Sequence, residues 1–180
     1  MPDAAALRLT PAMEKFILHW GEMGSKWGIN RTVAQVHALL YVAPRPLHAE
    51  EITDTLGVAR SNVSTCLKEL VEWGIVETSP VLGDRRTHYV SLTDVWEMFR
   101  RVCHERKRRE LDPTFVAVRE CLAEAGAGER HLKERLGALV GFFDDLSAFY
   151  DSVHALPQST TRKLFRAGAK LRRLFGGRRA

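Results

Sequence analysis

The chain has 180 residues and a formal net charge of +5, a length that suits one ordinary domain or a small domain with a helical extension. Residues 158–180 contain eight Lys and Arg and no Asp or Glu, so residues 1–157 carry −3, the difference between +5 and +8. The basic character therefore belongs to the C-terminal segment, and an argument for nucleic-acid binding elsewhere must rest on individual charges.

Several function classes find no support in the residues. No apolar run approaches the roughly 18 residues that span a bilayer, and the first residues lack a basic region before an apolar core, so we expect a soluble, unexported, cytoplasmic protein. Three cysteines without C-x-x-C spacing suit a reducing compartment. The scattered histidines predict no metal site and no cofactor. Without a Gly-rich phosphate loop or a nucleophile elbow, we do not expect an enzyme.

Two helices are predicted before residue 44. The first begins at Thr10-Pro11, where a cap residue precedes Pro. We expect Gly21, Gly24 and Gly28 to break it and residues 24–30 to form a loop. A second helix begins after Asn30. The apolar faces of the two helices consist of Met13, Phe16, Ile17 and Trp20 in the first and Val33, Val36, Leu39 and Leu40 in the second.

The stretch 49–70 has the pattern of two short helices joined at Gly57. Apolar residues recur at helical spacing on both sides of that glycine, so the two helices share one core. The opposite face of the second helix, predicted over 60–73, must then point outward. That face carries small polar groups and cations: Arg60, Ser61, Asn62, Ser64, Thr65 and Lys68. Such side chains let a helix approach a DNA groove closely, which predicts a helix-turn-helix with this recognition helix.

The alternative is an ordinary helical hairpin with a solvated outer face. Solvated faces are usually rich in Glu and Lys, whereas Ser, Thr and Asn are poor helix-interior residues, and this favours DNA reading. His48 and Ala59 stand where Ser or Thr would cap the two helices, at a cost of about 1 kcal/mol each. His48 is instead a candidate phosphate contact.

A hairpin is predicted directly after the recognition helix. Residues 75–78 and 88–92 read as strands, and residues 81–87 as the turn between them. Arg85 and Arg86 lie at the turn, where a wing would meet an adjacent minor groove. An exposed basic turn without function is the alternative, and it is the weaker one after such a helix.

Five segments together resemble the MarR-type winged helix: Ala59–Ser64, Leu67 with Leu70, Gly74–Val76, Gly83–Arg86 and Val90–Thr93. The longer stretch from Met13 to Thr93 is similar to the GbsR branch of that superfamily, notably in Trp20–Gly24 and Leu39–Val42. The resemblance covers about half of the chain. It implies a bacterial or archaeal transcriptional regulator that is a homodimer.

The resemblance also implies roles for individual residues. Arg60, Ser61, Asn62, Ser64, Thr65 and Lys68 would face the major groove, and Arg86 the minor groove, braced by Asp84. Two departures stand out: Ala59 replaces the usual cap hydroxyl, and the basic tail lies outside the family pattern.

Relatives in the GbsR branch respond to choline, so Trp20, Trp27 and Trp96, with Trp73, are candidates for an aromatic effector cage. A buried structural Trp is the alternative at each position. Cys66 could sense redox, but it lies beside Leu67 on the inner side of the helix, which favours an inert buried thiol.

The region after the wing is predicted to be helical. A helix from 93 would turn Trp96, Phe99, Val102 and Cys103 inward, and its charged end, 105–110, is interpreted as a solvated face. Asp112-Pro113 caps the next helix, with Phe115, Val118 and Leu122 on its apolar face. The helix after Gly128 has a sustained seam at heptad spacing: Leu132, Leu136, Leu139, Phe143, Leu146, Tyr150 and Val153.

The seam predicts lengthwise packing on another helix. Its partner could be the chain's first helix or a second subunit; we favour both, and a monomeric bundle is the alternative. After Pro157, apolar residues face one way, at 164, 168, 171 and 175, and basic residues cover the rest. Such a helix can lie on a membrane, on DNA phosphates or on an acidic partner, and we prefer phosphate contact or dimer clasping.

The expected fold is mainly α with a small β-wing, a winged helix-turn-helix flanked by dimerisation helices. Its parts are 1–29 (N-terminal helix and loop), 30–93 (DNA binding), 94–157 (dimerisation) and 158–180 (tail). The predicted function is a sequence-specific regulator of transcription, a ligand-responsive repressor that binds a palindromic double-stranded DNA operator as a homodimer. A winged-helix module for protein interaction is the rival.

Overall fold

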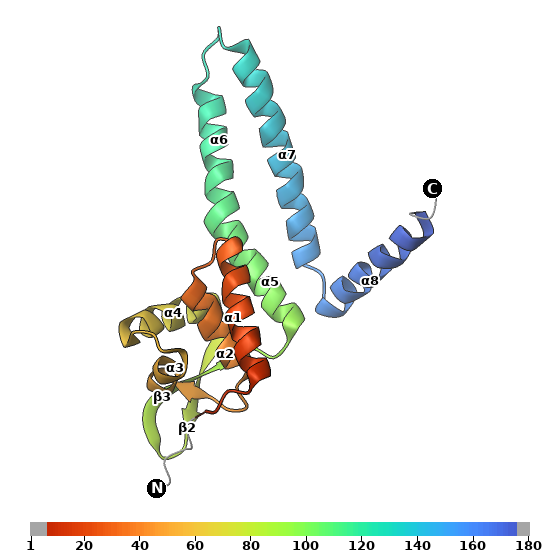
Figure 1. The fold of residues 1–180 in the computed structure, drawn as a ribbon. Coiled ribbons are helices and arrows are strands. Elements are labelled where there is room, and N and C mark those ends of the chain that lie inside the picture. The colour runs from red at the N-terminus through yellow and green to blue at the C-terminus, as the bar shows by residue number, and fades with distance from the viewer. Residues whose placement is uncertain (1–6, 176–180) are drawn as a thin grey trace. The chain divides into compact units, whose positions relative to one another are not determined.

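The computed structural model describes the backbone of residues 7–175 and the side chains of residues 7–167. It consists of two compact units divided between Arg101 and Val102 (Figure 1). The fold is mainly helical with one small antiparallel sheet, as the sequence predicts. Within the described residues, no helix combines the length and the apolar character that crossing a bilayer requires.

The first unit holds the N-terminal helices, the helix-turn-helix and the sheet. The helices of this unit are α1 (Pro11–Lys26), α2 (Arg31–Val42), α3 (Ala49–Leu56), α4 (Arg60–Glu72) and the first part of α5 (Val95–Arg106). Its core is apolar, and its largest fully buried side chains are Leu39, Leu47, Ile52, Leu67 and Leu70. These come from α2, the short strand β1 (Leu47–His48), α3 and α4, so the helix-turn-helix is built onto α2.

The predicted break in the first helix is wrong. Helix α1 runs through Gly21 and Gly24 to Lys26, and only Gly28, at φ +76°, takes a backbone conformation that favours glycine. A Cβ at Gly24 would lie 2.6 Å from Cβ of Ala34, and one at Gly21 would lie 2.6 Å from Cγ of Gln35. The two glycines therefore let α1 approach α2 closely, a tertiary reason that local spacing does not reveal.

The helix-turn-helix has the predicted form. Gly57, at φ +64°, makes the corner between α3 and α4 in the left-handed conformation that glycine adopts freely. Ile52 on α3 is fully buried, together with Val63, Leu67 and Leu70 on α4. Asn30 caps α2 by accepting hydrogen bonds from the backbone N–H groups of Thr32 and Val33.

The sheet has one strand more than expected. Strands β2 (Val76–Val81) and β3 (Asp84–Ser91) form the wing hairpin, and β1 (Leu47–His48) pairs with β3 on its other side, giving the order β1-β3-β2. The predicted turn over 81–87 is too long, because strand pairing continues to Val81 and Asp84 around Leu82 and Gly83. The polar residues at the start of β3, 84–87, do not alternate with apolar ones, so the sequence pattern did not indicate this extension.

The second unit contains the rest of α5, a π-helical turn η1 (Lys107–Leu111), α6 (Asp112–Glu124), α7 (Arg130–His154) and α8 (Gln158–Phe175). Helix α6 begins at Asp112 with Pro113 in its first turn, as predicted, but Asp112 does not cap it. Arg106, Leu111 and Asp112 all keep right-handed helical backbone angles, so the chain stays helical from α5 into α6. Helices α6 and α7 lie side by side as an antiparallel hairpin (Figure 1).

Aromatic contacts hold this hairpin together. Phe115, which is buried as expected, stacks on Phe143 with ring centroids 4.2 Å apart. Near the start of α6, Lys107 lies over the ring of Tyr150, and Tyr150 stacks on His154. Farther along, Arg119 pairs with Asp144 across the two helices.

The predicted solvated face at 105–110 is wrong for Glu105, which is buried and contacts Arg108 and Arg109.

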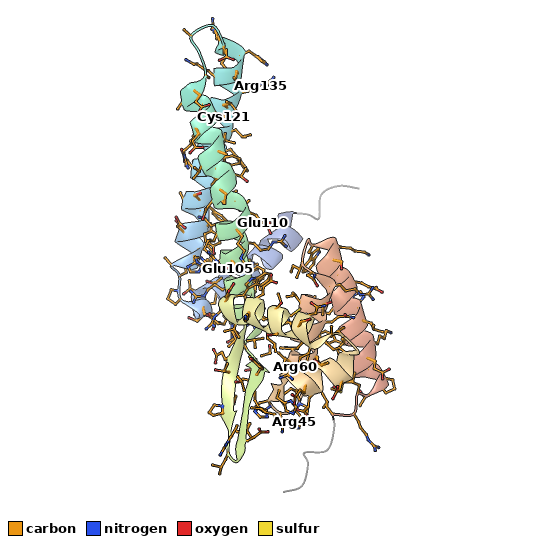
Figure 2. All side chains as sticks on the ribbon, turned by 90° about the vertical axis from the view of Figure 1, so that its left-hand side faces the viewer. Arg45, Arg60, Glu105, Glu110, Cys121 and Arg135 are labelled. Carbon is orange, nitrogen blue, oxygen red and sulfur yellow. The ribbon has the colours of Figure 1, made fainter. Side chains whose placement is uncertain are left out.

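The seam of α7 is only partly covered. No residue of α7 is buried, and Leu132 and Leu139 are 41% and 42% exposed. Phe142 and Phe149 beside the seam are more exposed still, and side chains project from all sides of the hairpin (Figure 2). The expectation that Phe99 turns inward is also wrong within the single chain, since it is 51% exposed.

Helix α8 begins after Pro157 as expected. Leu164 on it is exposed. The predicted apolar positions 168, 171 and 175 lie outside the residues whose side chains are described, and residues 176–180 lie outside the described chain.

Candidate nucleic-acid interface

The outer face of α4 is open to solvent. One face of this helix, formed by Val63, Cys66, Leu67 and Leu70, is buried against the rest of the first unit. The face opposite them is exposed along its length, and it carries the predicted set of Arg60, Ser61, Asn62, Ser64, Thr65 and Lys68. This is the geometry expected of a helix that enters a groove, because nothing in the first unit covers the polar face.

Two of the uncharged side chains in this set also make contacts within the protein. The Asn62 amide donates to Oγ1 of Thr32 on α2 at 3.4 Å, and its oxygen accepts from the Cys66 thiol at 3.6 Å. The Thr65 hydroxyl donates to the carbonyl of Ser61. Both side chains therefore stand in defined positions, with Ser61, Ser64 and Lys68 around them. Ala59 makes no side-chain cap, as the sequence predicts.

Arg86 is held in place at the wing. Its Nε donates to Asp84 Oδ1 at 2.9 Å and to Oδ2 at 3.0 Å, and its backbone N–H donates to the same carboxylate. These hydrogen bonds lower the pKa of Asp84 far below its ordinary value. Asp84 thus contacts Arg86 as the resemblance implies, and both Arg85 and Arg86 are exposed.

His48 is a helix cap. Its Nδ1 accepts from the backbone N–H of Glu51, and the Glu51 carboxylate accepts from the backbone N–H of His48, so the pair forms a capping box. The expectation of a missing cap at 48 is therefore wrong, because the imidazole takes the role of a hydroxyl. The side chain is buried, and it has Glu50 and Glu51 around it.

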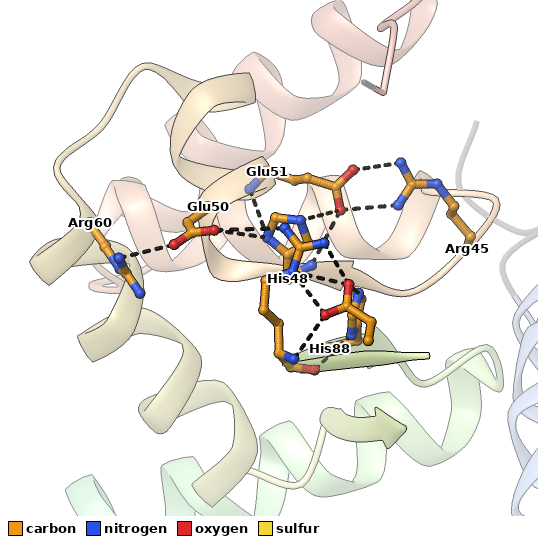
Figure 3. Close-up of polar contacts among 8 residues, drawn as sticks. Arg45, His48, Glu50, Glu51, Arg60 and His88 are labelled. Carbon is orange, nitrogen blue, oxygen red and sulfur yellow. Dashed lines mark hydrogen bonds and ion pairs between the residues drawn. The ribbon is translucent and has the colours of Figure 1, made fainter. Parts of the chain in front are cut away.

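A charged network surrounds this cap (Figure 3). Arg45 makes two hydrogen bonds to Glu51, and these lower the pKa of that carboxyl. The rings of His48 and His88 meet edge to face at 5.4 Å, and Nε2 of His88 lies 3.5 Å from Asp84. The network connects the start of α3 with the wing.

A groove of about 260 Å³ lies between the start of α3, α4 and the wing. Its charged groups are the guanidiniums of Arg60 and Arg86 and the carboxylate of Glu50. Glu50 lies 3.1 Å from Nη1 of Arg60 and 3.8 Å from Nη1 of Arg86. The remaining lining residues are His48, Ala49, Ser64, Thr87 and Tyr89.

Glu50, Thr87 and Tyr89 were not foreseen from the sequence. Glu50 looked like an ordinary acidic residue in the first turn of a helix, where it suits the helix dipole. Its two arginines come 10 and 36 positions later, and only the fold brings them together.

The aromatic candidates differ in exposure. Trp20 packs on Phe16 with centroids 5.3 Å apart and is 38% exposed, and Trp27, which follows α1, is 56% exposed. The alternative of a buried structural Trp holds for Trp73 and fails for these two; Trp96 is half-buried. Cys66 is buried, and burial raises the pKa of its thiol, which agrees with an inert thiol.

The chain is similar to known proteins in sequence and in fold. Residues 27–87 match the model of the MarR family. One solved structure, titled as a transcriptional regulator, has a TM-score of 0.54 and 21% identity, and the match covers 79% of this chain and 99% of that one. A transcriptional regulator from Thermotoga maritima has a TM-score of 0.38 and 18% identity over 81% and 94%. No curated protein matches the chain. The first unit therefore has a MarR-like winged-helix fold, and residues 27–87 are similar to the MarR family.

Proposed function

We propose that this protein is a transcriptional regulator that binds double-stranded DNA sequence-specifically as a homodimer, on a palindromic operator. The MarR family match and the winged-helix fold support a DNA-binding regulator. Repression is the sign of regulation that we propose, and assignment to the GbsR branch rests on the sequence resemblance alone.

The observation that carries the proposal is the exposed polar face of α4. Its inner face, with Val63, Cys66, Leu67 and Leu70, is buried in the first unit, while the hydroxyls, amide and cations from Arg60 to Lys68 are exposed. Ser, Asn and Thr side chains read base edges, and Lys68 and Arg60 can contact phosphates or guanine. Arg85 and Arg86 would hold the neighbouring minor groove or its phosphates.

The second unit supplies the argument for a dimer. Its long helix α7 has an apolar seam at heptad spacing, yet no residue of that helix is buried in the single chain. An apolar surface of this length beside Phe142 and Phe149 is typical of a subunit interface. In a symmetric dimer, two recognition helices would enter successive major grooves about 34 Å apart.

A small effector would regulate the dimer by changing the separation of the two recognition helices. About 1 to 3 kcal/mol of coupling is enough for such an effect. Trp20, Trp27 and Trp96 remain the proposed aromatic contacts. The partly exposed rings of Trp20 and Trp27 support an available aromatic surface near α1.

Selection of bound duplexes from a random DNA pool tests the proposal. The wild type is expected to enrich one palindromic sequence. Arg86→Ala should weaken binding and flatten its salt dependence while keeping the preferred sequence, because it removes a backbone or minor-groove contact. Lys68→Ala should change the preferred sequence or relax it at one position. Unchanged affinity and preference in both variants would contradict the proposed roles.

The rival function is a winged-helix module for protein interaction. The many exposed apolar side chains of the second unit favour some partner. Failure of the same selection to enrich any sequence, with a correctly folded protein, would favour this rival.

A further inference from the structure

Within the described residues, Glu50 is the one carboxylate that contacts two of the three candidate DNA-binding arginines, Arg60 and Arg86. Its Oε1 lies 3.1 Å from Arg60 on the recognition helix, and its Oε2 lies 3.8 Å from Arg86 on the wing. Figure 3 shows Glu50 between Arg60 and the residues around His48. The groove thus contains a negative charge at the place where a DNA backbone would bring another.

The side chain of Glu50 contributes little to the stability of the fold. The capping box of α3 is made by His48 and Glu51, and Glu51 also takes both hydrogen bonds from Arg45. The side chain of Glu50 is 46% exposed, whereas that of Glu51 is 14% exposed. Removing the charge at position 50 should therefore leave the fold intact.

The two ion pairs of Glu50 are suited to exchange. The side chains of Arg60 and Arg86 are 69% and 51% exposed, and ion pairs at such exposure contribute little to stability. A phosphate can replace the carboxylate while keeping charge-assisted hydrogen bonds to the same guanidiniums. Ser64 and Thr87 line the groove and offer hydroxyl groups to the same phosphate.

Asp84 has a different role. It binds Arg86 through three side-chain hydrogen bonds and one backbone bond, so it orients that guanidinium firmly. Glu50 approaches Arg86 at a longer distance and from another element. Asp84 therefore orients Arg86 firmly, whereas Glu50 makes a single, longer ion pair with it.

We propose that the groove between α3, α4 and the wing seats one phosphate of the DNA backbone, and that Glu50 is an internal counter-ion which this phosphate displaces. Glu50 pre-positions Arg60 and Arg86 in the free protein, but on balance it weakens binding to any DNA sequence by repelling the phosphate. The inference rests on the proposed function and adds a residue that limits nonspecific affinity.

The test compares Glu50→Gln with wild type on the selected operator and on a duplex of unrelated sequence, at several salt concentrations. Glu72→Gln is the matched control, because it removes the same charge from the far end of α4, about 18 Å along the helix. Thermal unfolding of each variant checks that the fold is unchanged.

We expect Glu50→Gln to bind both duplexes about fourfold more tightly, as removal of a like charge some 5 Å away in water predicts. The salt dependence should steepen, because the groove then neutralises more phosphate charge. The control should have a clearly smaller effect. In an Arg60→Gln background, the gain from Glu50→Gln should shrink, since the carboxylate would have lost its nearest partner.

Three results would overturn the inference. Weaker or unchanged binding by Glu50→Gln would mean that orienting the arginines outweighs repulsion. A change confined to the operator would mean that Glu50 reads a base. An equal gain in DNA affinity with Glu72→Gln would mean that the change in net charge, and not the position of Glu50, strengthens binding. If the wild type binds neither duplex, the proposed function itself fails, which is a separate and recognisable outcome.

Discussion

His37 is a buried titratable side chain in the core of the first unit. Its Nε2 lies 3.3 Å from the Ser91 hydroxyl, and burial lowers the pKa of His37 to about 4 from 6.5. The unfolded chain therefore binds a proton between pH 6.5 and pH 4 while the folded chain does not. In this window the free energy of unfolding falls as the pH falls.

We expect the wild type to lose about 2 kcal/mol of stability through this group between pH 7.5 and pH 5. Urea denaturation at the two pH values measures it. His37→Gln removes the titrating group. Between pH 7.5 and pH 5, the variant should therefore lose about 2 kcal/mol less unfolding free energy than the wild type. An identical pH dependence in both proteins would contradict the burial argument.

Asp84 offers a test in which two effects have opposite signs. Removing its charge makes the wing more positive, which alone would strengthen DNA binding. Because Asp84 orients Arg86 through several hydrogen bonds, we expect Asp84→Ala to weaken binding instead. Titration of a fluorescent duplex measures the affinity, and Asp54→Ala on α3 provides the same change of charge. Tighter binding by Asp84→Ala would show that the brace is unimportant.

Among the helices and strands, the glycines show where sequence patterns predict a helix end wrongly. Gly21 and Gly24 looked like helix breakers, but they lie inside α1 where α2 comes close. Gly57 is correctly predicted, because its role depends on the local corner between α3 and α4. Local backbone requirements can be read from spacing, whereas close approach between helices depends on residues elsewhere in the chain.

Gly24→Ala should destabilise the first unit by about 1 to 3 kcal/mol, since the new methyl group would lie 2.6 Å from Cβ of Ala34. Gly141→Ala on α7 is the matched control, because a Cβ there meets nothing within 4 Å. That variant should gain about 0.5 to 1 kcal/mol from helix propensity. Thermal unfolding measures the midpoint temperature of each variant relative to wild type. A change of the same sign in both variants would contradict the packing argument.

The wing and its surroundings were predictable in part. The hairpin and its arginines follow from the alternating residues and the turn chemistry of Gly83. Strand β1 was missed because two residues are too few for a periodic signal. The cap at His48 was missed because imidazole is an unusual substitute for a hydroxyl, and its role depends on Glu51 reaching back.

At the scale of the whole molecule, the two units have different degrees of burial. The first has a continuous apolar core, whereas α7 in the second has no buried residue. Heptad spacing predicted a packed seam, and the structure shows the part that α6 covers, with Phe115 against Phe143. In the proposed dimer a second chain covers the remaining surface, and spacing within one sequence does not identify that partner.

We expect the protein to be a dimer of about twice 20.4 kDa by light scattering. Leu139→Glu should shift it toward the monomer and weaken operator binding at least tenfold, because each recognition helix then binds alone. Glu134→Gln on the same helix is a conservative control. If Leu139→Glu remains a dimer, the dimer interface does not lie at the seam of α7.

Methylation interference on the selected duplex asks whether α4 reads bases, because the modified atom, guanine N7, lies in the major groove. We predict two clusters of interfering guanines about ten base pairs apart, one for each α4, and Lys68→Ala should weaken the interference within those clusters. Binding that tolerates methylation of every guanine, at a site that contains guanines in both halves, would contradict the claim that the exposed face of α4 reads bases in the major groove.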